Sequence, residues 1–97
     1  MFIVLLKLSN NKAKAPEFMA AHNEWIAQGF ADGIFQCVGS IIPANGGALL
    51  AHGESRDLIQ TGVDEDPFVQ NDIVTAEIIE VDVKKTAPAL NFLNGGG

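Results

Sequence analysis

Two residues that lie far apart in the sequence could together perform acid–base chemistry: His22 and Asp66. An imidazole exchanges a proton near neutral pH, so histidine is the side chain used most often as a general acid or base. A carboxylate that accepts a hydrogen bond from one ring nitrogen fixes the tautomer and makes the other nitrogen more basic. If the fold brings the two side chains together, they form a pair that can remove a proton from a small substrate.

Both residues also have a purely structural interpretation. His22 lies on the apolar face of a predicted helix, beside Trp25, and a histidine at the edge of a core can be satisfied by one hydrogen bond. Asp66 precedes Pro67, and an Asp-Pro step is typical of a helix N-cap followed by proline at the first helical position. The residues alone leave both interpretations open.

Five other residues carry side chains that we consider for a site. The Ser40 hydroxyl could orient a ligand, although a serine in a strand often has no such role, and Trp25 and Phe68 are candidates for contacting a substrate. We expect Cys37 to be a small core residue. His52, at the end of a predicted strand, is expected to be exposed and structural.

Several classes of function are disfavoured by what the sequence lacks. Two histidines without Cys, His or Glu at ligand spacing do not predict a metal site, and no glycine motif for binding phosphates is present, so we expect no metal and no cofactor. The net charge is −6, with 12 acidic residues against 6 scattered basic ones. This charge argues against binding to nucleic acids or to acidic lipid surfaces.

Cysteine content and the first residues bear on location. A single cysteine allows no intrachain disulfide, which fits a reducing compartment. The apolar run at the start ends at Leu8, far short of the ~20 residues that span a bilayer. We therefore expect a cytoplasmic protein with no membrane segment, in which this run is the first strand.

Periodicity and turn residues divide the chain into six main elements of one domain. Gly29 is expected to cap the first helix, Ser55 is expected to begin the second, and that helix should be interrupted at Asp66. The domain spans residues 1–97, with a core over about 2–85 and a largely irregular tail over 86–97. The expected elements are strand 2–8, helix 16–29, strand 33–42, strand 47–53 after a hairpin at 43–47, a helix from 55, and strand 73–83.

This βαββαβ order predicts an α+β domain of the ferredoxin-like type, with a four-stranded antiparallel sheet. Two helices cover only one face of such a sheet, yet the first strand is apolar on both faces, with Ile3 and Leu5 opposite Val4 and Leu6. Soluble monomers seldom expose a large apolar patch. We therefore expect a homodimer that packs through the sheet face; the alternative is that the tail covers this face within one chain.

Several segments together resemble the YCII-related (YciI-like) family. They are the AHNEWI segment around His22, the Val-Gly-Ser segment before a glycine-rich hairpin, and Asp66-Pro67-Phe68 before the last strand. The resemblance covers about residues 2–85 and implies a ferredoxin-like fold assembled as a dimeric α+β barrel. It also implies that His22 and Asp66 form an active-site dyad. Ser40 departs from the family pattern, in which many members have proline.

The resemblance implies an activity as well. Some members of the family are assigned as small lyases or dehydrochlorinases of hydroxylated, chlorinated aromatics, and related barrels include muconolactone isomerases and monooxygenases. Our hypothesis is a cofactor-independent enzyme in which His22 abstracts a proton and elimination or isomerisation follows. The alternative is a dimer that binds a small molecule, or assists another protein, without catalysis.

Overall fold

The computed structural model describes residues 1–43 and 46–94, and its elements follow the predicted order. Part of the expected hairpin turn and the three terminal glycines lie outside the described residues. The elements are β1 (Phe2–Leu8), η1 (Lys12–Lys14), α1 (Ala15–Ala31), β2 (Phe35–Ser40), β3 (Gly46–Ala51), α2 (Arg56–Asp64), α3 (Pro67–Gln70), β4 (Val74–Glu80) and η2 (Pro88–Leu93).

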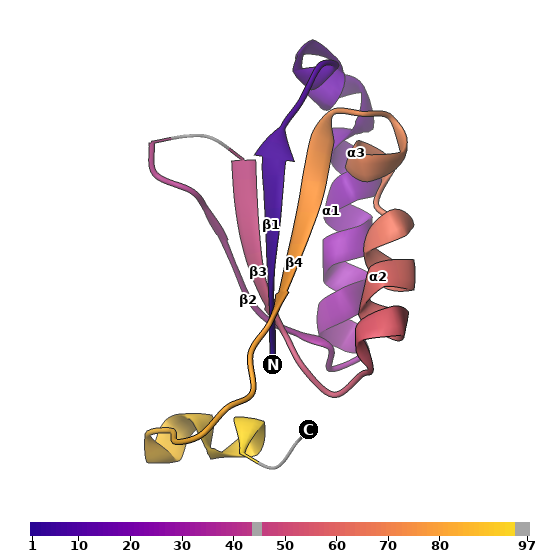
Figure 1. The fold of residues 1–97 in the computed structure, drawn as a ribbon. Helices are drawn as coiled ribbons and strands as arrows, with labels where there is room; N and C mark the ends of the chain where they lie inside the picture. Colours follow the sequence, from indigo (N-terminus) through magenta and orange to yellow (C-terminus); the bar gives the residue numbers. More distant parts are fainter. Residues whose placement is uncertain (44–45, 95–97) are drawn as a thin grey trace.

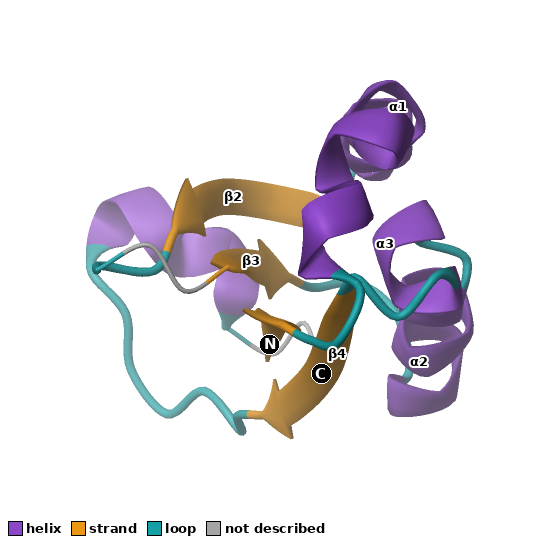
Figure 2. Cartoon of the chain, turned by 90° about the horizontal axis from the view of Figure 1, so that it is seen from above, coloured by secondary structure: helices purple, strands orange, loops and turns teal. Residues whose placement is uncertain are grey.

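The four strands form one antiparallel sheet in the order β2-β3-β1-β4. Helices α1, α2 and α3 lie together on one face of this sheet, and among residues 1–43 and 46–94 no helix covers the opposite face (Figure 1). The view from above shows the same two layers (Figure 2). The predicted ferredoxin-like α+β fold is confirmed.

The core lies between the sheet and its helices. Residues of β1 alternate, so that Phe2, Val4 and Leu6 are buried, whereas Ile3 and Leu5 on the opposite face are partly exposed. A period of two is what a pleated strand requires when one of its faces is covered. The other buried apolar residues are Phe35, Leu49, Ala51, Ile59, Val63, Phe68, Ile73, Val74 and Leu93.

The end of α1 differs from the prediction that Gly29 caps it. The helix continues to Ala31, and Gly33 adopts the left-handed conformation, with φ 74°, just beyond it. Gly29 is buried inside the helix, and a Cβ there would lie 2.1 Å from the Phe35 ring. This glycine therefore permits close packing of α1 on β2 rather than ending the helix.

Strand β2 contains an irregularity that strict alternation did not predict. Its register with β3 shifts between Phe35 and Cys37, as in a β-bulge, so these two residues point to opposite faces. After the shift, Val38 and Ser40 share the helix-covered face with Phe35. The prediction that Cys37 is a core residue is wrong, because the shift places it on the exposed side of the sheet. Bulges re-aim side chains in this way.

The helix starts in the second half of the chain follow the predicted caps. The Ser55 hydroxyl accepts a hydrogen bond from the Leu58 backbone N–H, and α2 ends at Asp64. Asp66 then caps the short α3, with Pro67 in its first turn. Strands β2 and β4 are shorter than predicted. The Ile34 N–H bonds to the Gly29 carbonyl of α1, and β4 ends at Glu80, opposite Phe2 at the start of its partner β1.

The tail after β4 lies beyond one end of the sheet and does not cover the open face (Figure 1). Its η2 segment anchors through Leu93, which is buried, and through Phe92, whose ring contacts the His52 ring edge-to-face at 5.1 Å. His52 is only partly exposed, because its ring packs against Phe92, whereas the sequence predicted an exposed residue. Among residues 1–43 and 46–94, no helix is both long and apolar enough to cross a membrane.

The open face of the sheet carries an apolar row across all four strands. Cys37 pairs with Leu50, Leu50 with Ile3, and Ile3 with Ile79. Side chains directly opposite one another on antiparallel strands point to the same face and are in contact distance. Ile79 is 39% exposed. This continuous row is the surface on which we expect a second copy of the chain to pack.

We predict that Ile3→Asp converts a dimer into a monomer, because it places a charge at the centre of the apolar row. Light scattering should give twice the chain mass for the unmodified protein and the single chain mass for the variant, with the circular dichroism spectrum retained. Ile42→Asp is the matched control, because Ile42 is 90% exposed and lies outside the strands. A monomeric unmodified protein at micromolar concentration would refute the dimer.

Gly29→Ala is expected to destabilise the fold by about 1–3 kcal/mol, because the new methyl group must displace the buried Phe35 ring. Gly62→Ala is the control, since a Cβ at this position in α2 meets nothing within 4 Å. There the gain in helix propensity should stabilise the fold by about 0.5–1 kcal/mol. Urea unfolding measures both changes, and equal free energies for the two variants would contradict the close packing.

Candidate active site

The structure brings His22 and Asp66 into direct contact. His22 lies in the middle of α1, and its Nδ1 is 2.7 Å from Oδ1 of Asp66, 44 residues further along the chain. The imidazole is 11% exposed and the carboxylate is fully buried. Because Nδ1 is engaged by the carboxylate, Nε2 is the ring nitrogen available to a ligand.

Asp66 serves two elements with one oxygen atom. Its Oδ1 accepts the His22 hydrogen bond and also the Phe68 backbone N–H at 3.0 Å, which caps α3. The geometry therefore allows Asp66 to cap α3 and to orient His22 at the same time. Its Oδ2 is buried and has no hydrogen-bond partner among the described residues. Leaving a buried polar atom unpaired costs about 1–3 kcal/mol.

Aromatic rings hold the imidazole in place. The Phe68 ring lies parallel to it, with centroids 3.9 Å apart and an interplanar angle of 2°. The Trp25 indole stacks more distantly, at 5.9 Å, and its Nε1 donates a hydrogen bond to the Gly62 carbonyl in α2. The ring plane of His22 is thus fixed by Phe68, and its rotation is fixed by Asp66.

His22 opens onto a cavity of about 390 Å³ between α1 and the sheet. Phe68 and Ser40 also line it, so three of the five predicted site residues face the same space. Trp25 does not line this cavity, and Asp66 lies behind the imidazole. The lining is mainly apolar, with Leu6, Leu8, Met19, Ile26, Val38, Leu49 and Val74.

Asn23 also lines this cavity, and the sequence alone did not single it out as a site residue. It follows His22 directly on α1 and supplies a donor and an acceptor at the cavity wall. Its position next to a candidate base was the only available signal. Within the described residues, no group of three or more His, Cys, Asp or Glu side chains could hold a metal ion.

Comparison with known proteins identifies a structural neighbour but no sequence relative. No protein-family model matches the sequence, and no curated protein matches it significantly. A solved structure, 5-chloro-2-hydroxyhydroquinone dehydrochlorinase (TftG) from Burkholderia phenoliruptrix AC1100 in complex with 2,5-dihydroxybenzoquinone, superposes with a TM-score of 0.68. The match is 16% identical and covers 84% of this chain and 94% of that chain. At this identity, the likeness shows a shared fold.

Asp66→Ala is expected to destabilise the protein by about 2–4 kcal/mol, because it removes the α3 cap and leaves the buried imidazole without a partner. Asp66→Asn should cost less, because its amide oxygen can still accept both hydrogen bonds. Urea unfolding gives these values. In addition, ¹⁵N NMR should show the His22 proton on Nδ1 in the unmodified protein, and a proton on Nε2 instead would contradict the hydrogen bond.

Proposed function

We propose that this chain is a small enzyme that acts without a cofactor, and that His22, oriented by Asp66, is its general base. The observation that carries the proposal is the 2.7 Å hydrogen bond of a nearly buried imidazole that lines an apolar cavity. A candidate base must lie within reach of a bound substrate and must present a free ring nitrogen to it. His22 meets both conditions through Nε2.

The unpaired Oδ2 of Asp66 supports this proposal over a purely structural one. An N-cap needs a single acceptor, which a serine supplies without burying a second oxygen. Asp66 instead carries a buried carboxylate with one atom unsatisfied among the described residues. A buried polar atom without a hydrogen-bond partner is unusual in a folded protein and needs an explanation, and a catalytic role is one such explanation. Here the carboxylate would stabilise the imidazolium that forms when His22 takes a proton.

The reaction that fits is proton abstraction followed by electron rearrangement. Nε2 takes a proton from a hydroxyl group or an activated carbon of the substrate. In an elimination, the electron pair left behind expels a leaving group such as chloride, and the imidazolium later releases its proton to solvent. In an isomerisation, the imidazolium returns the proton to another atom of the same substrate. General-base help of this kind contributes roughly 10²–10⁴-fold to the rate.

The cavity favours a single-ring substrate with polar substituents. A volume of about 390 Å³ lies within the usual range for small-molecule sites. Ser40 and Asn23 can hydrogen-bond a hydroxyl or carbonyl group, while the apolar lining accepts the ring. The structural neighbour is a dehydrochlorinase of a chlorinated hydroquinone. We therefore propose hydroxylated, chlorinated aromatics first and small lactones second.

The test is a screen of such compounds for chloride release or isomerisation, followed by His22→Gln. Loss of the base should lower turnover by at least roughly 10²-fold. His52→Gln is the matched control, because His52 is the only other histidine and lies outside the cavity. Full turnover by His22→Gln would refute the role of His22.

The same screen separates the enzyme from the alternative of a non-catalytic binder. If a compound binds in the His22 cavity but is recovered unchanged under all conditions, the protein is a binding dimer or an accessory subunit. In that case, His22→Gln should weaken binding of that compound, and neither the unmodified protein nor the variant should form a product.

A further inference from the structure

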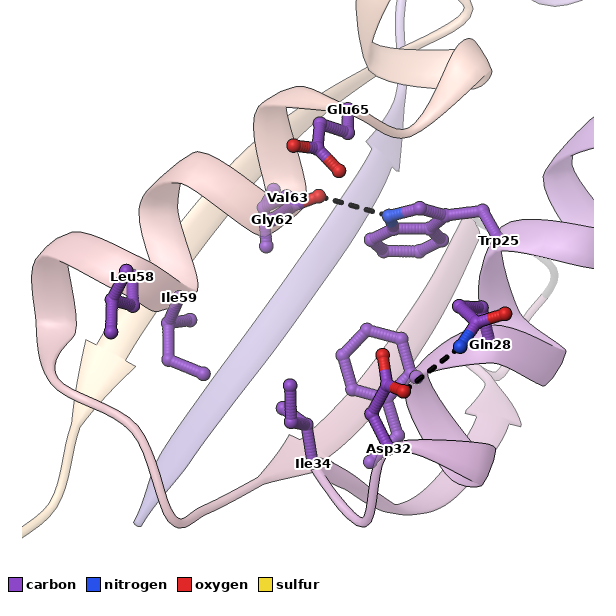
Figure 3. A pocket seen from close by; sticks show the side chains of 11 residues that line it. Trp25, Gln28, Asp32, Ile34, Leu58, Ile59, Gly62, Val63 and Glu65 are labelled. Atoms are coloured by element: carbon purple, nitrogen blue, oxygen red, sulfur yellow. Dashed lines mark hydrogen bonds between the residues drawn. The ribbon is translucent and has the colours of Figure 1, made fainter.

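A second cavity, of about 170 Å³, lies between α1 and α2 (Figure 3). Trp25 connects it to the site described above: the indole lines this second cavity and stacks on His22, which lines the first. No residue lines both cavities. The second cavity is therefore a separate space, and its role does not depend on the proposed chemistry of His22.

The inner surface of the second cavity is apolar and aromatic. Its floor is formed by Phe35, Ile59 and Val63, all of which are buried. Trp25 and Ile34 form walls, and the indole points from α1 toward α2 (Figure 3). The Trp25 hydrogen bond to the Gly62 carbonyl holds the ring in this orientation.

The α2 side of this cavity includes a glycine. Gly62 lines the cavity, and a Cβ added there would meet nothing within 4 Å. A glycine inside a helix costs about 0.5–1 kcal/mol relative to alanine. Gly62 therefore lowers the stability of α2, and no close contact among the described residues requires a glycine at this position.

The polar groups at this cavity are acidic. Asp32 and Glu65 contribute carboxylates, Gln28 contributes an amide, and no lysine, arginine or histidine lines the cavity. Asp32 accepts a hydrogen bond from the Gln28 amide at 2.8 Å. Glu65 makes no salt bridge or side-chain hydrogen bond with the described residues. Figure 3 shows Glu65 just beyond Gly62 and Val63, on the α2 side of the cavity.

We propose that this cavity binds a small organic cation, namely a protonated amine that carries one ring or a short branched alkyl group. An apolar cavity of ~150 Å³ in another protein holds benzene, so the volume here suits a single ring. Tryptophan is the aromatic side chain that attracts cations best. An ammonium group in the cavity beside Trp25 would also lie within the field of the carboxylates of Asp32 and Glu65, both of which are exposed residues.

The position of the cavity keeps it accessible in the expected dimer. Helices α1 and α2 lie on the face of the sheet opposite the apolar row of Cys37, Leu50, Ile3 and Ile79 (Figure 1). A partner on that row would leave the helix layer exposed to solvent. The cation could therefore enter in either oligomeric state.

The experiment is a titration of the full-length protein with benzylamine, benzyl alcohol and benzoate, three ligands of nearly equal size and different charge. Trp25 is the only tryptophan, so its fluorescence and its indole N–H signal report directly on the cavity. Benzylamine should saturate with a Kd on the order of 1 mM, as expected for a ligand of this size. Benzyl alcohol should bind roughly fivefold to tenfold more weakly, and benzoate should not bind.

Backbone amide shifts locate the bound amine. Perturbations should centre on Asp32, Ile59, Gly62 and Glu65, and not on Ser40 in the His22 cavity. Equal binding of benzylamine and benzyl alcohol, or perturbations confined to the His22 cavity, would overturn the proposal.

Variants separate a specific site from general attraction to an acidic protein. Asp32→Asn combined with Glu65→Gln should weaken benzylamine to the level of benzyl alcohol and leave benzyl alcohol unchanged. Glu17→Gln combined with Glu80→Gln removes the same charge from exposed positions outside the cavity. This control should leave the Kd of benzylamine unchanged, and equal weakening in both double variants would overturn the proposal.

Discussion

The arrangement of the site depends on a single oxygen atom, Oδ1 of Asp66. It accepts one hydrogen bond from the start of α3 and one from His22 in the middle of α1. Helix α3 is only four residues long, and so short a helix is not stable without tertiary contacts. Its cap therefore also fixes where α3 lies against α1. The same contact places the Phe68 ring on the imidazole, so orientation of the candidate base and packing of the helix layer have one cause.

The parts of the fold that the sequence predicted are those with local physical causes. The assignment of Ile3 and Leu5 to one face of the first strand and of Val4 and Leu6 to the other, the Ser55 cap and the Asp-Pro interruption each depend on a few neighbouring residues. Each is present in the structure. The pairing of His22 with Asp66 is not local. It was proposed from residue chemistry and from a resemblance, and the structure brings the two side chains together across 44 residues.

The features that escaped prediction arise from contacts between elements. The register shift between Phe35 and Cys37 turns Ser40 toward the His22 cavity, and nothing in the sequence around Gln36 marks it. Gly29 resembles a helix end in sequence, but its lack of a side chain serves the approach of Phe35. Helical spacing grouped Trp25 with His22, whereas its hydrogen bond to Gly62 directs the indole into the other cavity. Each of these three features depends on a contact with a residue in another helix or strand.

The sheet separates two surfaces with different physical properties. Its open face presents an apolar row, with the Lys7–Glu77 ion pair on the same face, and the row suits association with a second apolar surface. Its covered face holds both cavities, because helices that pack through aromatic residues and glycines leave gaps beside the large rings. Trp25 stands between these two gaps and contacts His22. An occupant of the second cavity would therefore contact the same tryptophan that stacks on the candidate base.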